Sequence, residues 1–403
     1  MKIVDAKVIV TCPGRNYILY KIYTDEGVYG VGDGTLNGRE LAVAELLDKH
    51  ITPLLIGKDP DKIEDTWQML YRGAYWRGGP VLNTALSAVD LALWDIKGKV
   101  CNKPVYSLLG GKTRLGALCY THCAGKDQVA VEDNARQVLS VGFRAIRAQV
   151  SLPGNTSTYG QGGASEAAVA AWGDGLPFEE TWEPATYLNT IPKLFEHLRS
   201  RLGTEVELLH DVHERLTPIQ AARLAKDLEP FRMFFLEDPI RPEHKQSLKI
   251  VREASVTPLA MGELYSSLWE CVSVVTEQLV DYVRCDLAHV GGITAARKIA
   301  NLAEPFSVQT AWHGPGDASP ITHAANVHVD ISIPNFGIQE MVFFPELVQE
   351  VIPGGPIFNN GYMIVSDKPG LGTDVNEELA KKYPYKRSYL PIARRLDGSV
   401  LDW

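Results

Sequence analysis

Three acidic residues are evenly spaced in the middle of the chain, each at the end of a short apolar run. Asp211, Glu237 and Glu263 follow one another at intervals of 26 residues (237 − 211 and 263 − 237) and close the segments VELLHD, FFLE and PLAMGE. Such runs predict buried parallel strands, whose carboxyl ends meet at one edge of a sheet. Carboxylate oxygens are the ligands that Mg²⁺ prefers. The spacing therefore predicts a magnesium site, although any one of these carboxylates alone would more simply face solvent or cap a helix.

Other polar residues end runs of the same kind. His213 lies two residues after Asp211, so the alternation of side chains along a strand places both on one face. His313 ends the run SVQTAWH, and Arg147 lies within AIRAQV. An imidazole at a strand end can transfer a proton, and a guanidinium can stabilise an anion. Each could instead be structural, for example in an ion pair at the rim of a barrel.

Four more candidates complete the set. Arg284 and Asp286 end the run YVRCDL, and Glu340 follows the last apolar run. Tyr159 lies in a Gly-, Ala- and Thr-rich segment of about 40 residues between AIRAQV and the next helical pattern, which is too long for a plain strand-to-helix turn. A long loop at the catalytic face of a barrel commonly supplies site residues or a lid.

The elements that must position these residues fall into three parts. Residues 2–35 alternate apolar and polar positions with turn signals, which predicts an antiparallel meander, and helical periods follow at 39–49, 63–71 and 82–100. We then expect eight strand runs alternating with helices: ALCYTHCAG, AIRAQV, VELLHD, FFLEDP, PLAMGE, YVRCDL, SVQTAWH and VHVDISI. The prediction is an α/β protein with an α+β capping (lid) domain at 1–113, a (β/α)₈ modified TIM barrel at 114–345, and a C-terminal segment, 346–403, that packs back on the capping domain.

Composition narrows the class of function. The chain has 403 residues, is 45% hydrophobic and carries a formal net charge of −9, with no basic run. This balance argues against nucleic acid or an anionic membrane as a partner. The start, MKIVDAKVIV, lacks the long apolar region of a signal peptide, and no stretch of 18 apolar residues occurs. We therefore expect a cytoplasmic enzyme that acts on a small molecule.

The motifs together resemble the enolase superfamily in its mandelate racemase-like branch. The resemblance rests on the three acidic strand ends and on SAVDLALWDIKGK, PVYSLLGG and DLAHVGGIT. Other segments are similar to the mannonate dehydratase subgroup: TCPGRNY, TLNGREL, YRGAYWRGGP, AIRAQ, HDVHERLTP, IPNFGIQE and the C-terminal YLPIARRLDGSVLDW. The resemblance covers essentially the whole chain.

This resemblance implies a Mg²⁺-dependent dehydration of D-mannonate or D-gluconate, with one Mg²⁺ per subunit. It implies that Tyr159, paired with Arg147, removes the proton at C2, and that His213 protonates the departing 3-hydroxyl. The product would be 2-keto-3-deoxy-D-gluconate. His313 is counted with these catalytic residues and would also contact the substrate. The substrate-binding residues implied are Asn37, His122, Arg284, Glu340 and Trp403, with Asp286 and Asp317 left undecided. Members of this superfamily commonly form homo-oligomers, so we expect one here.

Two departures leave alternatives open. Pro315 follows His313-Gly314 where some members have a small residue, and the fourth strand ends in the general form LEDPIRPEHK. The protein could therefore be a low-activity or regulatory member that binds a sugar acid. A further alternative is a sugar-acid epimerase in which His313, oriented by Asp286, acts opposite Tyr159; the presence of His213 argues against this, because epimerisation needs no acid for a leaving hydroxyl.

Overall fold

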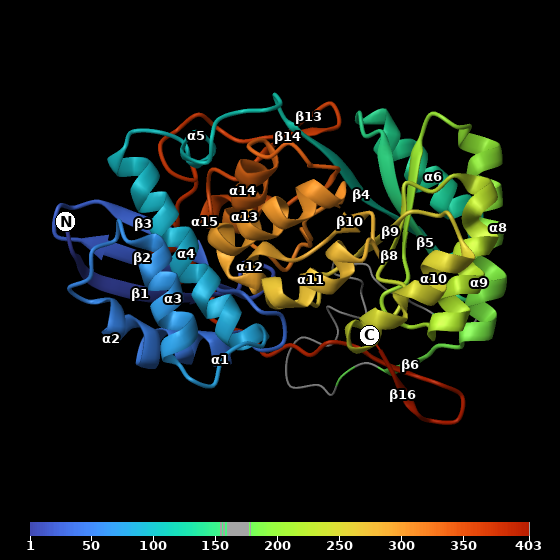
Figure 1. Cartoon of the computed structure of the whole chain (residues 1–403), viewed down its shortest axis with the longest axis horizontal. Coiled ribbons are helices and arrows are strands. Elements are labelled where there is room, and N and C mark those ends of the chain that lie inside the picture. The colour runs from blue at the N-terminus through green and yellow to red at the C-terminus, as the bar shows by residue number, and fades with distance from the viewer. Residues whose placement is uncertain (154, 156–157, 159–176, 178, 403) are drawn as a thin grey trace.

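An antiparallel sheet covered by helices forms the N-terminal end of the molecule. The computed structural model describes residues 1–153, 155, 158, 177 and 179–402. The sheet has the order β1 (Ile3–Thr11), β2 (Tyr17–Thr24), β3 (Tyr29–Asp33), as the alternation predicted. Its covering helices are α1 (Glu40–Glu45), the π-helix η1 (Leu46–Ile51), α2 (Thr52–Leu55), α3 (Ile63–Gly73) and α4 (Pro80–Val100). The helix α4 packs so closely on β3 that a Cβ at Gly30 or Gly32 would collide with its backbone (Figure 1).

Eight parallel strands close into the predicted barrel. They are β4 (Ala117–Gly125), β5 (Ala145–Val150), β7 (Glu207–Asp211), β8 (Phe235–Glu237), β9 (Leu259–Met261), β10 (Tyr282–Val283), β11 (Gln309–Thr310) and β12 (Gln339–Glu340). Hydrogen-bonded pairing runs from β12 through β4 to β11, and a parallel bridge between Thr310 and Phe336 closes the ring. Seven of the eight predicted runs coincide with these strands.

Helices follow the strands around the barrel. They are α6 (Gln128–Ser140), α8 (Pro184–Leu202), α9 (Pro218–Leu228), α10 (Leu248–Ala254), α11 (Leu268–Thr276), α12 (Leu287–Val290), α13 (Gly292–Ala303), α14 (Pro320–Asp330) and α15 (Glu346–Val351). Local sequence explains their starts: Thr217 and Gln220 form a capping box at α9, and Ser319 caps α14 before Pro320. The N-terminal elements lie at one end of the molecule and α8, α9 and α10 at the other (Figure 1).

The eighth strand is not where the sequence placed it. VHVDISI lies mostly in α14, which is buried along its whole length, and the strand is the two-residue β12 further along. A short apolar run bounded by polar residues has no period that separates a buried strand from a buried helix. Ser319 and Pro320 start the helix upstream of the run, and the hydrogen-bonded turns continue through it.

One layer of side chains fills the barrel interior. Its buried members come one from each of seven chain segments: Tyr120, Ala145, Leu209, Phe235, Ala260, Ala311 and Ile338. Because side chains on one face of a strand recur every second residue, the next inward position on each strand lies one layer higher, towards the carboxyl ends. This layer is therefore the support on which the site is built.

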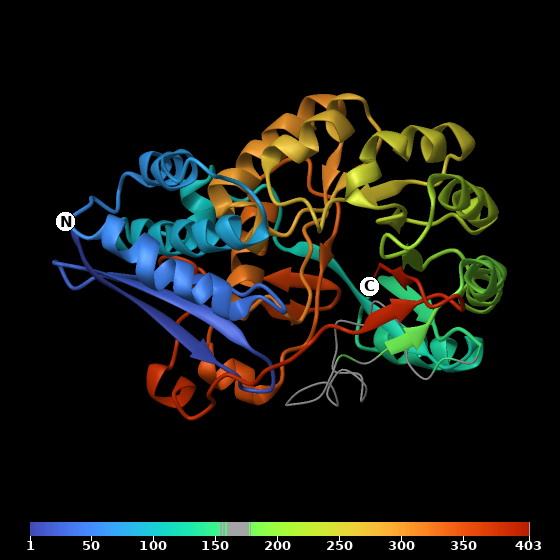
Figure 2. The ribbon, with the colours of Figure 1, turned by 90° about the horizontal axis from the view of Figure 1, so that it is seen from below.

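The C-terminal segment crosses the molecule. Its elements are β13 (Ile357–Asn359), β14 (Tyr362–Ile364), α16 (Glu377–Ala380), β15 (Ile392–Arg394) and β16 (Val400–Leu401). In α16, Glu377 pairs with Lys7 at 2.6 Å and with Lys21 at 3.0 Å on the N-terminal sheet. Further on, β15 and β16 form a small sheet with β6 (Glu179–Thr181) beside the barrel (Figure 2). The domain boundaries at 113 and 345 stay predictions.

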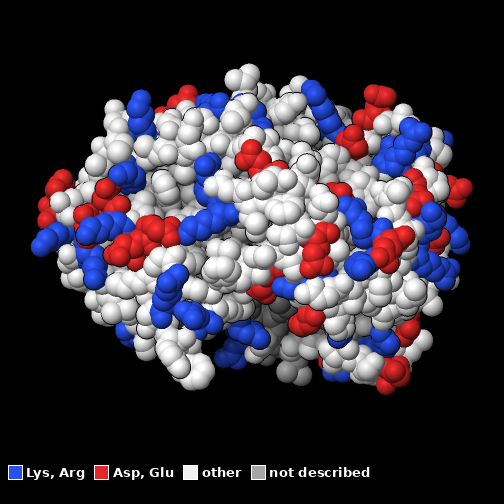
Figure 3. Space-filling view, viewed as in Figure 1, with Lys and Arg blue, Asp and Glu red and all other residues white. Residues whose placement is uncertain are grey.

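Acidic and basic side chains are interspersed over the face seen in Figure 3, without the concentrated basic stripe that is typical of nucleic-acid binding. No helix in the described part of the chain has both the length and the apolar character needed to cross a membrane.

Candidate active site

The predicted site residues form the layer above the barrel core. His122, Arg147, Asp211, Glu237, Arg284, His313 and Glu340 each lie two residues after an inward-facing residue of their own strand or its extension. They therefore point to the same interior, at the carboxyl ends of the strands. Glu263 differs in register, because it follows β9 by two residues after the turn at Gly262, whose φ is +140°.

Two guanidinium groups hold the floor of the site together. Arg147 Nη1 lies 3.1 Å from Asp211 and 3.0 Å from Glu237. Arg284 Nη2 lies 2.8 Å from Glu237 and 2.5 Å from Glu340, and it donates to the hydroxyl of Tyr120 at 2.9 Å. All these groups are buried, so the ion pairs are only weakly screened by solvent. Arg284 has no exposed surface, and its predicted contact with substrate stays a prediction.

Glu340 is the most heavily paired carboxylate of the floor. Besides Arg284 it contacts His122 Nε2 at 2.5 Å and accepts from the Gly314 backbone at 2.9 Å. Burial opposes its ionisation, but Arg284, His313 and His122 outweigh burial and hold the pKa of Glu340 well below its usual range. This carboxylate is therefore ionised and fixed in place.

The three predicted metal ligands occupy neighbouring strand ends. Asp211 and Glu237 are paired in register on β7 and β8, and Glu263 follows the adjacent β9. Burial would raise the pKa of Asp211, but His213, Arg147 and Arg284 lower it. At Glu237 burial prevails over the two arginines and raises the pKa to about 8. Buried carboxylates arranged at one edge are a donor set that suits Mg²⁺, and a bound cation would favour their ionised forms.

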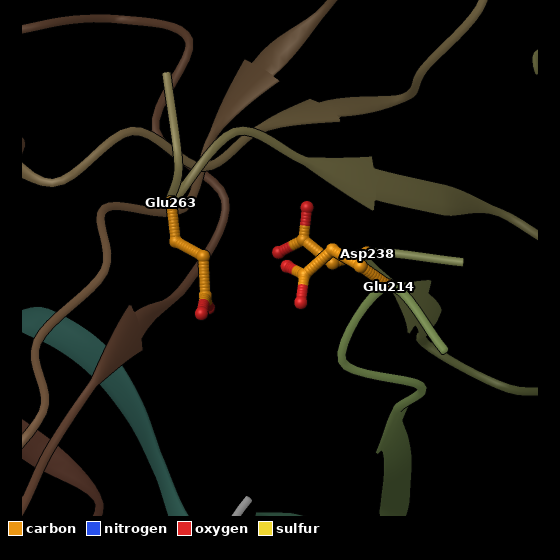
Figure 4. Close-up of side chains that lie close together, drawn as sticks. All are labelled: Glu214, Asp238 and Glu263. Atoms are coloured by element: carbon orange, nitrogen blue, oxygen red, sulfur yellow. The ribbon is translucent and has the colours of Figure 1, made fainter. Parts of the chain in front are cut away.

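Sequence reasoning missed two acids beside this set. Glu214 follows His213, and Asp238 follows Glu237; with Glu263 they form a buried group whose oxygens all lie within 4.8 Å of one another (Figure 4). Burial raises the pKa of both Glu214 and Asp238 well above the usual range. The sequence does show these two acids, as the last residues of HDVHE and LED. Strand alternation, however, assigns them to the face opposite that of Asp211 and Glu237. Left-handed backbone turns at these residues, with φ of 60° and 37°, bring them back to the site.

His213 lies above the floor, between two predicted ligands. Its Nε2 is 3.6 Å from Glu263 and 3.9 Å from Asp211, and its side chain borders the open cleft. The residue has a φ of 59°, in the left-handed region, and its backbone N–H donates to Asp211 at 2.8 Å. An imidazole in this place can exchange a proton with a molecule in the cleft.

His313 and Asp286 lie in contact, a pairing that the sequence alone had left undecided. His313 Nδ1 lies 2.8 Å from Asp286, which is fully buried. Burial would lower the pKa of His313, but Glu263, Glu340 and Asp286 raise it to about 10. The contact with Asp286 fixes the orientation of the imidazole, which borders the cleft with its Nε2 3.6 Å from Glu263 and 3.9 Å from Glu340.

A cleft of about 490 Å³ opens above these groups. Its wall combines barrel residues with residues from the N-terminal part and the C-terminal segment: Leu36, Asn37, Arg39, Pro80, His213, Glu214, Pro242, Glu243, Glu263, Leu264, Ser266, His289, His313, Asp317, Leu390 and Asp402. Asn37 donates to Asp317 at 2.7 Å across the boundary between the N-terminal part and the barrel. The volume fits a small polar molecule rather than a polymer.

Two predicted residues, Tyr159 and Trp403, lie outside the described residues, and so does any pairing of Tyr159 with Arg147. The assignments of catalytic and substrate-binding roles stay predictions.

Comparison with known proteins identifies related chains. Residues 7–110 match the N-terminal domain of the mandelate racemase and muconate lactonizing enzyme family, and residues 130–379 match the enolase C-terminal domain-like family. A D-mannonate dehydratase from Caulobacter vibrioides is 50% identical over the full length of both chains. A D-galactonate dehydratase family member from Cellvibrio japonicus is 49% identical, also over the full length of both.

Solved structures agree with these matches. An enolase from Pantoea ananatis, crystallised with D-gluconate and magnesium, has a TM-score of 0.91 and 44% identity, and the match covers both chains completely. An enolase from Agrobacterium radiobacter, described as a putative galactarate dehydratase and bound to sodium and L-malate, has a TM-score of 0.86 and 25% identity.

Proposed function

The chain belongs to the mandelate racemase and muconate lactonizing enzyme family of enolase-like proteins, and on this basis we propose that it is a lyase that removes water from a sugar acid. The substrates we propose are D-mannonate and D-gluconate, with 2-keto-3-deoxy-D-gluconate as product. Support comes from full-length relatives named D-mannonate dehydratase and from a structural relative crystallised with D-gluconate and magnesium.

One observation carries the proposal. Three carboxylates at neighbouring strand ends, Asp211, Glu237 and Glu263, lie beneath a cleft of about 490 Å³, with His213 Nε2 within 3.9 Å of two of them. This arrangement combines a site for a divalent cation with a proton donor at the wall of the same cleft. Dehydration next to a carboxylate needs both groups at once.

The metal and its ligands follow from the donor set. We propose that Asp211, Glu237 and Glu263 hold one Mg²⁺. When bound, this ion supplies positive charge where the substrate carboxylate becomes more negative as the C2 proton leaves. Arg147 and Arg284 keep two of the carboxylates in place, because each guanidinium bridges a pair of acids.

The chain's own residues perform the proton transfers in this proposal. Tyr159 removes the proton at C2, and His213 gives a proton to the 3-hydroxyl, which leaves as water. A double bond forms between C2 and C3, and the enol becomes the 2-keto acid by protonation at C3. Asn37 and Asp317 lie across the cleft, where we expect them to contact the distal hydroxyls.

The test is a screen of sugar acids with the purified protein and Mg²⁺, in which formation of 2-keto-3-deoxy acid is measured. We expect turnover of D-mannonate, D-gluconate or both, and loss of turnover after treatment with EDTA. The His213→Asn variant separates the two steps, because it should still exchange the C2 proton in D₂O while it dehydrates poorly. Absence of both dehydration and exchange with every sugar acid would contradict the proposal.

A second candidate, epimerisation, has one observation in its favour. The contact of 2.8 Å between His313 and Asp286 orients the imidazole as a base would be oriented. In that case NMR in D₂O would show exchange at C2 and a change of configuration without loss of water. Dehydration that survives Asp286→Asn would exclude an essential role for this pair.

Three further expectations stay predictions: a cytoplasmic location, assembly into a homo-oligomer and occupancy of the predicted ligand set by one Mg²⁺. Light scattering would measure the assembly.

A further inference from the structure

The turn that follows β11, residues 312–316, carries His313 in the wall of the cleft. Side chains from other elements donate hydrogen bonds to most of its carbonyl oxygens: Gln339 to Trp312 at 3.0 Å, Asn326 to His313 at 3.1 Å, His323 to Pro315 at 3.0 Å and Tyr17 to Gly316 at 3.0 Å. These four donor side chains are at most 1% exposed. Buried side chains outside the turn therefore set the path of its backbone.

The peptide groups on both sides of His313 are held in this way. His313 N donates to the carbonyl of Cys285 at 3.1 Å, and Gly314 N donates to Glu340 at 2.9 Å. Together with the bond from Asn326 to the His313 carbonyl, these contacts leave the backbone dihedrals of His313 little freedom, so its Cα–Cβ bond points in one direction. The contact of 2.8 Å between Nδ1 and Asp286 then fixes the ring.

The turn has no spare room on the side of β12. A Cβ at Gly314 would lie 2.7 Å from the carbonyl oxygen of Glu340 and 2.8 Å from Nε2 of Gln339. Because packed interiors transmit small displacements, a shift of the turn would move His313 with it.

Two of the donors, His323 and Asn326, come from the same face of α14, because residues three apart on a helix are neighbours. A carbonyl oxygen only accepts, so Nε2 of His323 carries the hydrogen of the neutral ring. Burial lowers the pKa of His323 and so favours this neutral form. The ring of Phe344 packs edge-on against the imidazole, with the ring centroids 4.9 Å apart. The donor to Pro315 is therefore held in one orientation.

These polar groups have a cost in stability. Both side chains are fully buried, and His323 Nδ1 and Asn326 Oδ1 have no hydrogen-bond partner among the described residues. Burial of an unpaired polar atom is unfavourable, so an apolar helix face would fill the same space at lower cost. What the two polar side chains add is direction, since each aims an N–H group at one carbonyl of the turn.

We propose that His323 and Asn326 are positioning residues, which hold the turn so that the imidazole of His313 keeps its place in the wall of the cleft. Both lie outside the residues that line the cleft, so they act through His313 rather than on a bound molecule. Their effect on rate rests on the proposed dehydration, whereas their effect on the place of the imidazole does not.

Two substitutions of His323 test this proposal in the full-length protein. His323→Leu removes the donor to Pro315, and His323→Gln keeps an amide N–H group near the place of Nε2. For His323→Leu we expect kcat to fall about 30-fold, with KM and the Kd for Mg²⁺ within about threefold of the wild-type values, and His323→Gln should recover most of kcat. Crystal structures of the wild-type protein and of His323→Leu should show a displaced His313 ring and a longer contact with Asp286 in the variant.

His328→Leu is the matched control. His328 lies on the same helix and is equally buried, but its Nε2 contacts the carbonyl of Leu371 at 3.1 Å, in the C-terminal segment rather than in the turn. This variant should lose stability in urea unfolding to a similar degree, while kcat and the place of the His313 ring stay as in the wild-type protein.

Equal losses of kcat in His323→Leu and His328→Leu, or an unmoved His313 ring in crystals of His323→Leu, would overturn the proposal. If His323→Leu does not fold, Asn326→Leu replaces it, because this change removes the donor to the His313 carbonyl and should displace the same ring. Wild-type protein that turns over no sugar acid would contradict the proposed dehydration alone. The crystals would still decide the positioning, since a ring displaced in His323→Leu but not in His328→Leu supports it.

Discussion

Buried carboxylates occur in two regions of this protein, and they are satisfied in different ways. At the boundary between the N-terminal part and the barrel, Asp33 accepts from Thr35 N at 2.9 Å, Ser319 N at 2.7 Å and Thr322 Oγ1 at 2.7 Å. Asp95 accepts from two backbone N–H groups, of Val31 and Leu371, and pairs with Lys99. In the cleft, oxygens of Glu214, Asp238 and Glu263 have no hydrogen-bond partner among the described residues.

The difference separates structural acids from acids that can bind a ligand. Neutral donors surround Asp33, so its charge is stabilised without any added molecule. The acids beside the cleft keep buried oxygens that no donor among the described residues satisfies, so a bound cation would stabilise them most. Between the two extremes lie Glu237 and Glu340, which arginines hold on the floor of the site.

The largest effect should come from Glu263, a predicted metal ligand that borders the cleft. Glu263→Gln removes a ligand charge while it keeps the size of the side chain, and we expect turnover to fall by on the order of 10³-fold. Isothermal titration with Mg²⁺ should show weaker binding in parallel. Unchanged turnover at the same Mg²⁺ concentration would show that Glu263 is not a metal ligand. Glu263 would then not differ in function from the structural acids Asp33 and Asp95.

Asp33 represents the structural acids, whose loss should affect stability rather than metal binding. In Asp33→Asn an amide N–H₂ faces donors from Thr35, Ser319 and Thr322, so we expect a loss of roughly 3 kcal/mol in the free energy of unfolding. Urea unfolding measures this loss, and Mg²⁺ affinity of the folded variant should stay near wild type. A selective loss of Mg²⁺ affinity would show that Asp33 is not merely structural.

The buried carboxyl of Asp90 should make the free energy of unfolding depend on pH. Burial raises the pKa of this residue, on α4, to about 7, although Thr294 donates to it. The folded carboxyl keeps a proton that the unfolded chain releases near its ordinary pKa of about 3.9. The folded state therefore loses stability as the pH rises from about 4 through 7.

The Asp90→Asn variant cannot titrate, so its stability should be flatter than that of the wild-type protein between about pH 5 and pH 8. Urea unfolding at several pH values measures both curves. If the two curves ran parallel, Asp90 would not be the titrating group.

Tyr120 should produce the smallest effect. Its hydroxyl accepts from Arg284 at 2.9 Å, and its ring packs on Phe235 in the barrel core. Tyr120→Phe keeps the ring and loosens Arg284, so we expect kcat/KM to fall by about tenfold with little change in stability. Tyr282→Phe is the control, because Tyr282 packs on the same Phe235 but the loss of its hydroxyl removes no hydrogen bond to Arg284. Equal effects of the two changes would indicate packing rather than positioning.

Much of this protein could be predicted from local patterns. Short apolar runs that end in Asp211, Glu237 and Glu263 predicted three neighbouring strands, and the structure pairs them as neighbours. The full-length matches support the family to which the motifs pointed. The eighth strand was misplaced, because local sequence cannot separate a two-residue strand from a helix buried on all sides.

The sequence by itself determined which residues face the barrel interior. Side chains on a strand alternate, so Arg147, Asp211 and Glu237 had to follow Ala145, Leu209 and Phe235 on one face. Only the tertiary structure decided how these charges pair, since Arg147 and Arg284 reach acids on other strands across the barrel. It also brought Glu214 and Asp238 beside Glu263, because left-handed turns after the strands reverse the direction that alternation assigns, and no local period encodes such a turn.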